Sequence, residues 1–167
     1  MKKTFVTIIT IILCFSTMIL AQKQSEEQKK LNFLVGEWKS VSVNQNTGKE
    51  SFGNSSIQWV LGGSWLQWKF VAQLEQGPLE VLTLINYHDK KKQYAFYSFN
   101  PYDDEPIPHY GHWLDTNTLR IETNFQGENV WVDFKIKENG DFVQEHSKRS
   151  ASGERVITAK TIYSKKK

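Results

Sequence analysis

Residues 31–43 read LNFLVGEWKSVSV, and this stretch decides the fold. A short apolar turn that contains Leu31 and Leu34 leads to Gly36, and Trp38 follows at the start of an alternating segment. Glycine allows a sharp change of chain direction, and the tryptophan ring fills a large volume. The stretch therefore predicts the end of a helix, a sharp turn, and a first strand whose indole fills the closed floor of a barrel.

The segment before this turn has the pattern of one short helix. It reads SEEQKKLNFL, with Ser25 and Gln28 at the spacing of a capping box. Gly36 is placed to end the helix. We expect this helix to plug one end of the barrel that Trp38 helps to close.

Ten segments with strand character follow, and none of them has the pattern of a long helix. They are residues 36–43, 56–61, 64–74, 80–88, 93–100, 107–114, 118–125, 129–137, 141–149 and 155–164. Turn residues such as Asn139-Gly140 separate them at the spacing of an antiparallel meander. Apolar and polar residues alternate in several segments, so each strand has one dry and one wet face. We predict an all-β fold, a single antiparallel up-and-down barrel of about ten strands, in which closure removes exposed strand edges.

A family resemblance supports the same architecture. The stretches that carry it are LNFLVGEW, IQWVLGGSWLQWKF, LTLINYHDKKKQY and YGHWLDTNTLRIE, which span about residues 31–162. In this order they resemble the bacterial domain-of-unknown-function family 1579. The resemblance implies a lipocalin-like, calycin-type barrel and no established activity. Two details differ from the family pattern: Asn86-Tyr87-His88 stands where Gly-Tyr-Asp is commoner, and Leu114 separates Trp113 from Asp115.

The first 21 residues have the pattern of a secretory signal peptide. Two lysines precede an apolar run that ends at Ala21, a small residue suited to cleavage. We expect an exported protein, periplasmic or secreted, with a linker and helix start at 22–30, a barrel at 31–164 and a basic tail at 165–167. A retained membrane anchor is the alternative, and lipidation of Cys14 is disfavoured because bulky Leu13 precedes it.

Composition excludes several classes of function. The formal net charge is +3, and two of the basic residues lie in the predicted signal peptide, so the chain lacks the basic surface that binds nucleic acid. The chain contains no G-x-S-x-G elbow, no H-E-x-x-H pair and no phosphate-binding glycine loop. Because no catalytic motif is present, we favour a binding protein over an enzyme, and no membrane contact is expected after signal cleavage.

The alternation predicts which side chains face the interior. Trp68 and Phe70 share a face with other apolar residues, and Phe134 faces inward by the same rule. With Trp38 and Tyr87, they are our candidates for the lining of a ligand cavity. A lining of this kind suits a small apolar or amphipathic molecule, although ordinary barrel packing explains the same aromatic residues.

His146 is the sixth candidate. Phe142, Gln144 and His146 share one side of a late strand, so an inward orientation would place an imidazole beside an amide in the interior. Haem-binding barrels such as nitrobindin hold iron through a late-strand histidine. The chain resembles them only in its barrel pattern and lacks their local motif. No cofactor is therefore predicted; a haem or metal bound by His146, or an enzyme acting in the same cavity, is the alternative function.

Metal binding elsewhere has little support. His109 and His112 are three residues apart in a predicted strand and face opposite sides, so they cannot share one metal ion without a bulge. The acidic segment at 103–105 lacks the spaced ligands and central glycine of a calcium loop. Residues 80–87 and 93–99 are apolar on both faces, which predicts either a covered wall or a homodimer contact.

Overall fold

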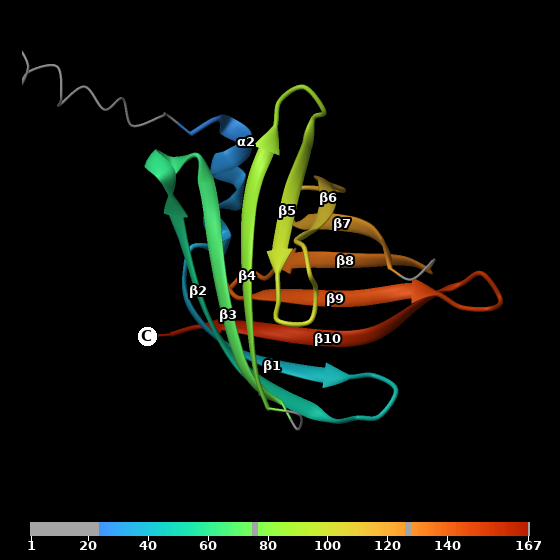
Figure 1. Ribbon diagram of the computed structural model, residues 1–167. Helices are drawn as coiled ribbons and strands as arrows, with labels where there is room; N and C mark the ends of the chain where they lie inside the picture. The colour runs from blue at the N-terminus through green and yellow to red at the C-terminus, as the bar shows by residue number, and fades with distance from the viewer. Residues whose placement is uncertain (1–23, 75–76, 126–127, 167) are drawn as a thin grey trace, which may run out of the picture.

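The computed structural model describes residues 24–74, 77–125 and 128–166, and it contains a closed ten-stranded barrel (Figure 1). The strands are β1 (Gly36–Asn44), β2 (Glu50–Val60), β3 (Trp65–Leu74), β4 (Gly77–His88), β5 (Gln93–Phe99), β6 (Ile107–Trp113), β7 (Thr118–Phe125), β8 (Glu128–Ile136), β9 (Phe142–Arg149) and β10 (Arg155–Lys165). Each strand pairs antiparallel with its neighbours in sequence, and β10 pairs with β1 to close the ring. The predicted fold class is confirmed.

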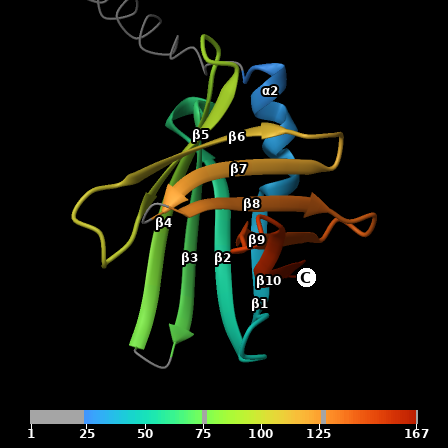
Figure 2. The same cartoon turned by 90° about the vertical axis from the view of Figure 1, so that its right-hand side faces the viewer.

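The sheet curls strongly as it closes. Figure 2 shows β6, β7 and β8 running across the direction of β2, β3 and β4, so the two sets of strands form opposite walls. Such a change of direction follows from the tilt and twist that strands need in a closed barrel. The inner faces of the two walls enclose the core and the cavity described below.

A short helical segment covers one end of the barrel. It consists of α2 (Glu26–Lys29) and a 3-10 turn, η1 (Lys30–Leu34). Ser25 and Gln28 form the predicted capping box, each accepting a hydrogen bond from the backbone N–H of the other. Leu31 and Leu34 have no exposed surface because they point into the barrel. None of the described helices combines the length and apolar character that a membrane crossing requires.

Polar contacts fasten this segment to the barrel. The amide of Gln28 donates to the carbonyl of Ser64 and to the side chain of Asn86, and the Tyr94 hydroxyl donates to the carbonyl of Glu27. These partners lie beside the β2–β3 and β4–β5 connections. Because successive connections of a meander alternate between its two ends, the β1–β2, β3–β4 and β5–β6 connections lie at the opposite, uncovered end.

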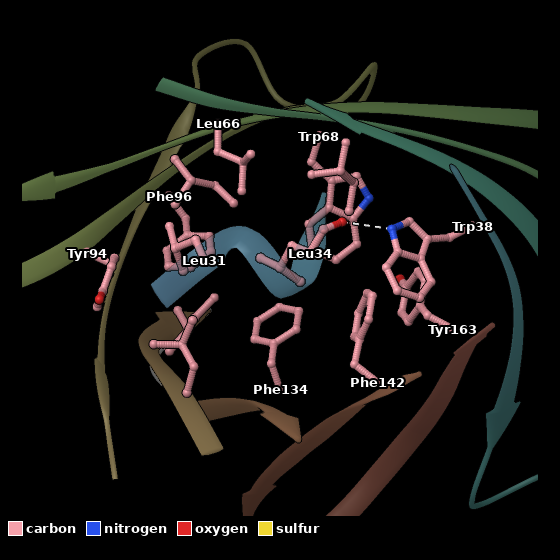
Figure 3. Close-up of a cluster of buried hydrophobic side chains, with 14 residues drawn as sticks. Leu31, Leu34, Trp38, Leu66, Trp68, Tyr94, Phe96, Phe134, Phe142 and Tyr163 are labelled. Atoms are coloured by element: carbon pink, nitrogen blue, oxygen red, sulfur yellow. Dashed lines mark hydrogen bonds between the residues drawn. The ribbon is translucent and has the colours of Figure 1, made fainter. Parts of the chain in front are cut away.

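The core lies directly beneath the helix (Figure 3). Gly36 has φ +140, which permits the sharp step from η1 into β1. Trp38 is then completely buried, and its indole N–H donates to the carbonyl of Leu34 over 2.7 Å. The ring of Phe142 lies 4.9 Å from that of Trp38, in an edge-to-face arrangement. The predicted roles of Gly36 and Trp38 at the closed floor are confirmed.

One strand begins earlier than the sequence pattern predicts. β2 starts at Glu50, whereas the alternation indicated a start near residue 56. The early inward positions are occupied by Ser51, Gly53 and Ser55, which carry no apolar signal. A Cβ atom at Gly53 would lie 2.5 Å from Cε2 of Phe70, so glycine is required where that ring crosses β2. The predicted signal peptide, with its cleavage near Ala21, lies outside the described residues.

Candidate functional site

A cavity of about 420 Å³ occupies the interior of the barrel. Its floor is formed by Trp68, Phe96 and Phe134, which also belong to the buried core under the helix. Towards the uncovered end, Leu74 and Leu79 line the wall at the β3–β4 hairpin. The core therefore fills the covered end of the barrel, and the cavity extends from it towards the uncovered end.

The wall of the cavity is mainly apolar and carries no formal charge. Aromatic and aliphatic side chains supply most of it, and none of the described residues that line it is Asp, Glu, Lys or Arg. The indole N–H of Trp68 donates to the hydroxyl of Ser55 over 2.9 Å, so this floor residue presents only carbon to the space above it. Burial of apolar surface is the main interaction that such a wall can offer a guest.

Two pairs of hydroxyl groups interrupt the apolar wall. Thr161 donates to Ser42 over 3.0 Å, and Thr83 lies 3.1 Å from Ser98. Each pair bridges neighbouring strands and satisfies one donor of the pair. These hydroxyls are therefore compatible with an empty cavity and do not require a ligand.

A chain of three polar side chains crosses the wall between β9 and β10. The hydroxyl of Tyr163 donates to Oε1 of Gln144 over 2.9 Å, and Nε2 of Gln144 lies 2.9 Å from Nε2 of His146. All three residues line the cavity. Gln144 and His146 share a face because they are two residues apart in β9, and the strand pairing brings Tyr163 beside them.

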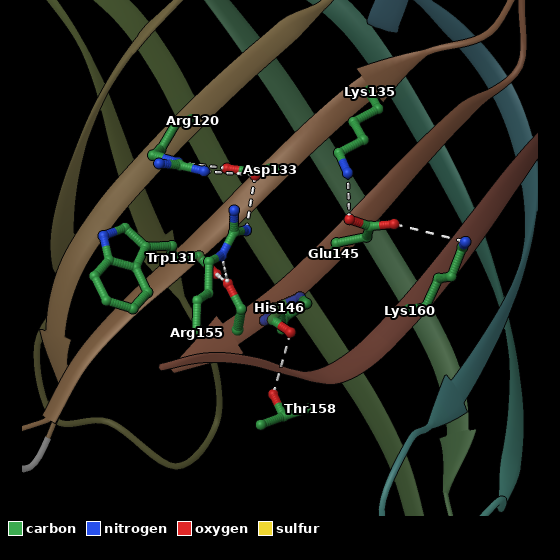
Figure 4. A network of polar contacts seen from close by, with 10 residues as sticks. Arg120, Trp131, Asp133, Lys135, Glu145, His146, Arg155, Thr158 and Lys160 are labelled. Atoms are coloured by element: carbon green, nitrogen blue, oxygen red, sulfur yellow. Dashed lines mark hydrogen bonds and ion pairs between the residues drawn. The ribbon is translucent and has the colours of Figure 1, made fainter. Parts of the chain in front are cut away.

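Burial controls the protonation of this chain. It raises the pKa of the Tyr163 hydroxyl and lowers the pKa of His146, because each charged form would lose hydration. Thr158 donates to the backbone carbonyl of His146 (Figure 4). Near neutral pH the three side chains of Tyr163, Gln144 and His146 are therefore all uncharged, with a phenol at one end of the row and a neutral imidazole at the other.

His109 is a second imidazole in the cavity wall, on β6 opposite Phe96. Its Nδ1 is buried and has no hydrogen-bond partner among the described residues. Burial lowers the pKa of His109, an effect that the nearby charge of Asp103 opposes. Alternation alone could have placed this side chain inward, but the sequence pattern gave no reason to prefer the parity of His109 to that of His112.

The outer face of the same wall holds a network of ion pairs that sequence reasoning missed (Figure 4). Asp133 is 1% exposed and accepts hydrogen bonds from Arg120 on β7 and Arg155 on β10, at 2.8 and 2.7 Å. Burial alone would raise the pKa of Asp133, but the two guanidinium groups outweigh it and lower the pKa. Glu145 lies between Lys135 and Lys160 in the same manner. The network faces away from the cavity, so it belongs to the stability of the wall.

The six candidate residues divide into two groups. Trp68, Phe70, Phe134 and His146 line the cavity. Trp38 and Tyr87 pack with the core at the closed end, where the ring of Tyr87 lies 5.0 Å from that of Tyr94, and neither lines the cavity. Ligand binding by any of the six remains a prediction. Sequence reasoning did not select Gln144 and Tyr163 because their importance depends on strand register.

The described residues contain no group of three or more His, Cys, Asp and Glu side chains that could hold a metal ion. His109 faces the cavity, whereas His112 lies opposite Arg120 on the outer face, so the two histidines point apart as predicted. The acidic segment at 103–105 is exposed at the uncovered end of the barrel.

Comparison with known proteins supports the family resemblance and the fold. The family described as protein of unknown function (DUF1579) matches residues 23–100, which confirms the resemblance for that part of the chain. A solved structure of an S-type phycobiliprotein lyase from Guillardia theta is similar in fold, with a TM-score of 0.57 and 14% sequence identity. The match covers 89% of this chain and 96% of that one. A comparison with curated proteins gives no significant match.

Proposed function

We propose that the barrel binds one small apolar or amphipathic molecule in its cavity. The observation that carries the proposal is a hollow of about 420 Å³ with a mainly apolar wall and a few polar side chains at defined positions. Pockets that bind small molecules are typically about 300–1,000 Å³ and have this composition. Removal of apolar surface from water would supply roughly 25 cal/mol per Å², before the costs of association.

The similar fold of a phycobiliprotein lyase adds modest support. A barrel of this fold serves as a phycobiliprotein lyase, so the fold is compatible with a role in binding another molecule. At 14% identity, the likeness supplies no ligand and no residue role for this chain.

A pair of substitutions on β3 tests the proposal. Ala72 is 5% exposed and lines the cavity, whereas its neighbour Val71 is 45% exposed on the outer face. Ala72→Trp should fill the cavity and weaken binding of the neutral lipophilic dye Nile red by at least about tenfold. Val71→Trp, which adds the same ring outside the barrel, should leave dye binding unchanged.

Equal dye binding by the two variants would reject the cavity as the site. Circular dichroism of both variants must first establish that the barrel remains folded. Native mass spectrometry after gentle purification provides a second test, because a retained molecule would appear as added mass that Ala72→Trp removes.

Haem or metal binding by His146 is one alternative function, and an enzymatic activity within the same cavity is the other. The contact with Gln144 engages Nε2 of His146, so ligation through that atom would require the contact to break. This contact supports the simple binding role over ligation of haem through Nε2. A Soret absorbance in protein purified from iron-replete cells, lost in His146→Ala, would favour haem instead.

Export and dimerisation complete the proposal. Cleavage near Ala21 would release the barrel to the periplasm or the medium, and N-terminal sequencing of the mature protein tests it. A homodimer would pair the outer faces of β4 and β5, where Leu82 and Phe99 lie opposite one another and Phe99 is 40% exposed. Sedimentation of the protein as a strict monomer would reject that contact.

A further inference from the structure

The hydrogen bonds around Gln144 indicate which nitrogen of His146 carries its proton. The hydroxyl of Tyr163 donates to Oε1 of Gln144, so the NH₂ group of the amide faces Nε2 of His146 over 2.9 Å. An amide NH₂ can only donate, and Nε2 must therefore accept. The neutral imidazole then carries its proton on Nδ1.

The resulting Nδ1–H group is available to a guest. It makes no hydrogen bond to a described residue, and the ring lines the cavity. Throughout the described ranges, the one buried side-chain nitrogen or oxygen without a partner is Nδ1 of His109. Nδ1 of His146 is not an atom of that kind. Because the ring lines the cavity and Gln144 engages its Nε2, Nδ1 is the polar atom of this ring that is left for a guest.

The lining also limits the charge of a guest. No described side chain in the wall carries a formal charge, and the ion pairs of Arg120, Lys135 and Arg155 lie on the outer face. A carboxylate, phosphate or ammonium group in the cavity would lose hydration without gaining a counter-ion, which costs several kcal/mol. A neutral acceptor, such as a ketone, aldehyde, ester or ether oxygen, avoids this cost.

We propose that the ligand is a neutral, mainly apolar molecule with one hydrogen-bond acceptor, and that Nδ1–H of His146 donates to this acceptor. This inference rests on the proposed binding function and specifies the class of ligand. Tyr163 and Gln144 are positioning residues, because they hold His146 in the required tautomer. The aromatic floor of Trp68, Phe96 and Phe134 receives the apolar part of the guest.

The tautomer can be tested on the protein alone. Two-bond ¹H–¹⁵N correlation spectra of the protein labelled at histidine should assign His146 as the Nδ1–H form. Tyr163→Phe removes the donor that orients Gln144, so the Nε2–H form should appear in that variant. An Nε2–H tautomer for His146 in the wild-type protein would overturn the inference.

The proposed class of ligand can be tested with a series of compounds of equal chain length that differ only in their end group. Binding of a long-chain methyl ketone, the alkane of equal length and the carboxylate of equal length should be compared by competition with Nile red. The ketone should bind about fivefold more tightly than the alkane, as one net hydrogen bond allows, and at least tenfold more tightly than the carboxylate. In His146→Phe the preference for ketone over alkane should vanish, whereas His146→Asn, which keeps an N–H near the Nδ1 position, should retain part of it.

The outcomes separate the two proposals. Binding of the carboxylate as tightly as the ketone, or a ketone preference that survives in His146→Phe, would overturn the ligand class while leaving the binding function intact. Failure of the dye and all three compounds to enter the cavity would reject the binding function itself. If His146→Phe does not fold, the His146→Asn variant and the tautomer measurement still decide the matter.

Discussion

Trp38 joins the helix to the barrel through one buried ring. It has no exposed surface, its N–H is paired with the carbonyl of Leu34, and its ring contacts Phe142. Trp38→Phe would leave a void and an unpaired buried carbonyl, so the free energy of unfolding should fall by about 2–4 kcal/mol in urea titrations. Trp131→Phe, which changes a ring on the outer face, should cost less than about 1 kcal/mol. Equal losses would contradict this role for Trp38.

The two histidines of the cavity predict how stability depends on pH. Burial lowers the pKa of both His109 and His146 below the ordinary value of 6.5. Near and below pH 6.5, the unfolded chain therefore binds more protons than the folded protein. The free energy of unfolding should decrease as the pH falls below 6.5. Urea titrations between pH 7.5 and about 5 should show this decrease in the wild-type protein.

A double substitution isolates this contribution. The variant with His109→Gln and His146→Asn lacks both titrating groups, so its stability should change less over the same pH interval. His112→Gln, on the outer face, is the matched control and should keep the wild-type pH profile. A double variant with an unaltered profile would assign the pH dependence to other groups.

At the scale of elements, Asp133 connects three strands through two arginines. Asp133→Asn would leave Arg120 and Arg155 without their shared carboxylate, and the free energy of unfolding should fall by about 3 kcal/mol at pH 7. The folded pKa of Asp133 lies below its ordinary value of 3.8, so this contribution is complete above pH 3.8 and is lost as the pH falls further. The gap between wild type and variant should therefore close in acid. Glu128→Gln, in an exposed pair with Lys148, should cost less than about 1 kcal/mol at any of these pH values.

The elements themselves could largely be predicted from the sequence. The capping box at Ser25 and the alternation in residues 118–123 depend only on local spacing, and both occur in the structure. The start of β2 could not be predicted in the same way. At the start of β2, the inward-facing positions hold Ser51, Gly53 and Ser55. The interior beside them is partly cavity, and the ring of Phe70 occupies the space next to Gly53.

The candidate site could be predicted only in part. The shared face of Gln144 and His146 follows from their spacing within one strand. Their contact with Tyr163 depends on the register of β9 against β10, where a bulge between Ile157 and Ala159 shifts the pairing. The burial of Asp133 likewise depends on Arg155, which a separate strand brings to it. Neither contact can be predicted from the residues of one strand, because each joins residues of different strands.

For the whole molecule, the closed ring predicts that the barrel unfolds as one unit. Every strand pairs on both sides, so no edge strand is available to separate first. With 5-fluorotryptophan incorporated, the ¹⁹F signals of Trp38 in the closed floor, Trp68 in the cavity and Trp131 on the outer wall should lose native intensity at the same temperature. Loss of the Trp131 signal well before that of Trp38 would mean that the wall of β7–β10 opens separately. The Asp133→Asn variant distinguishes these two behaviours. If the barrel unfolds as one unit, the variant should lower the thermal midpoints of all three ¹⁹F signals together. If the wall of β7–β10 opens separately, it should lower only the midpoint of Trp131.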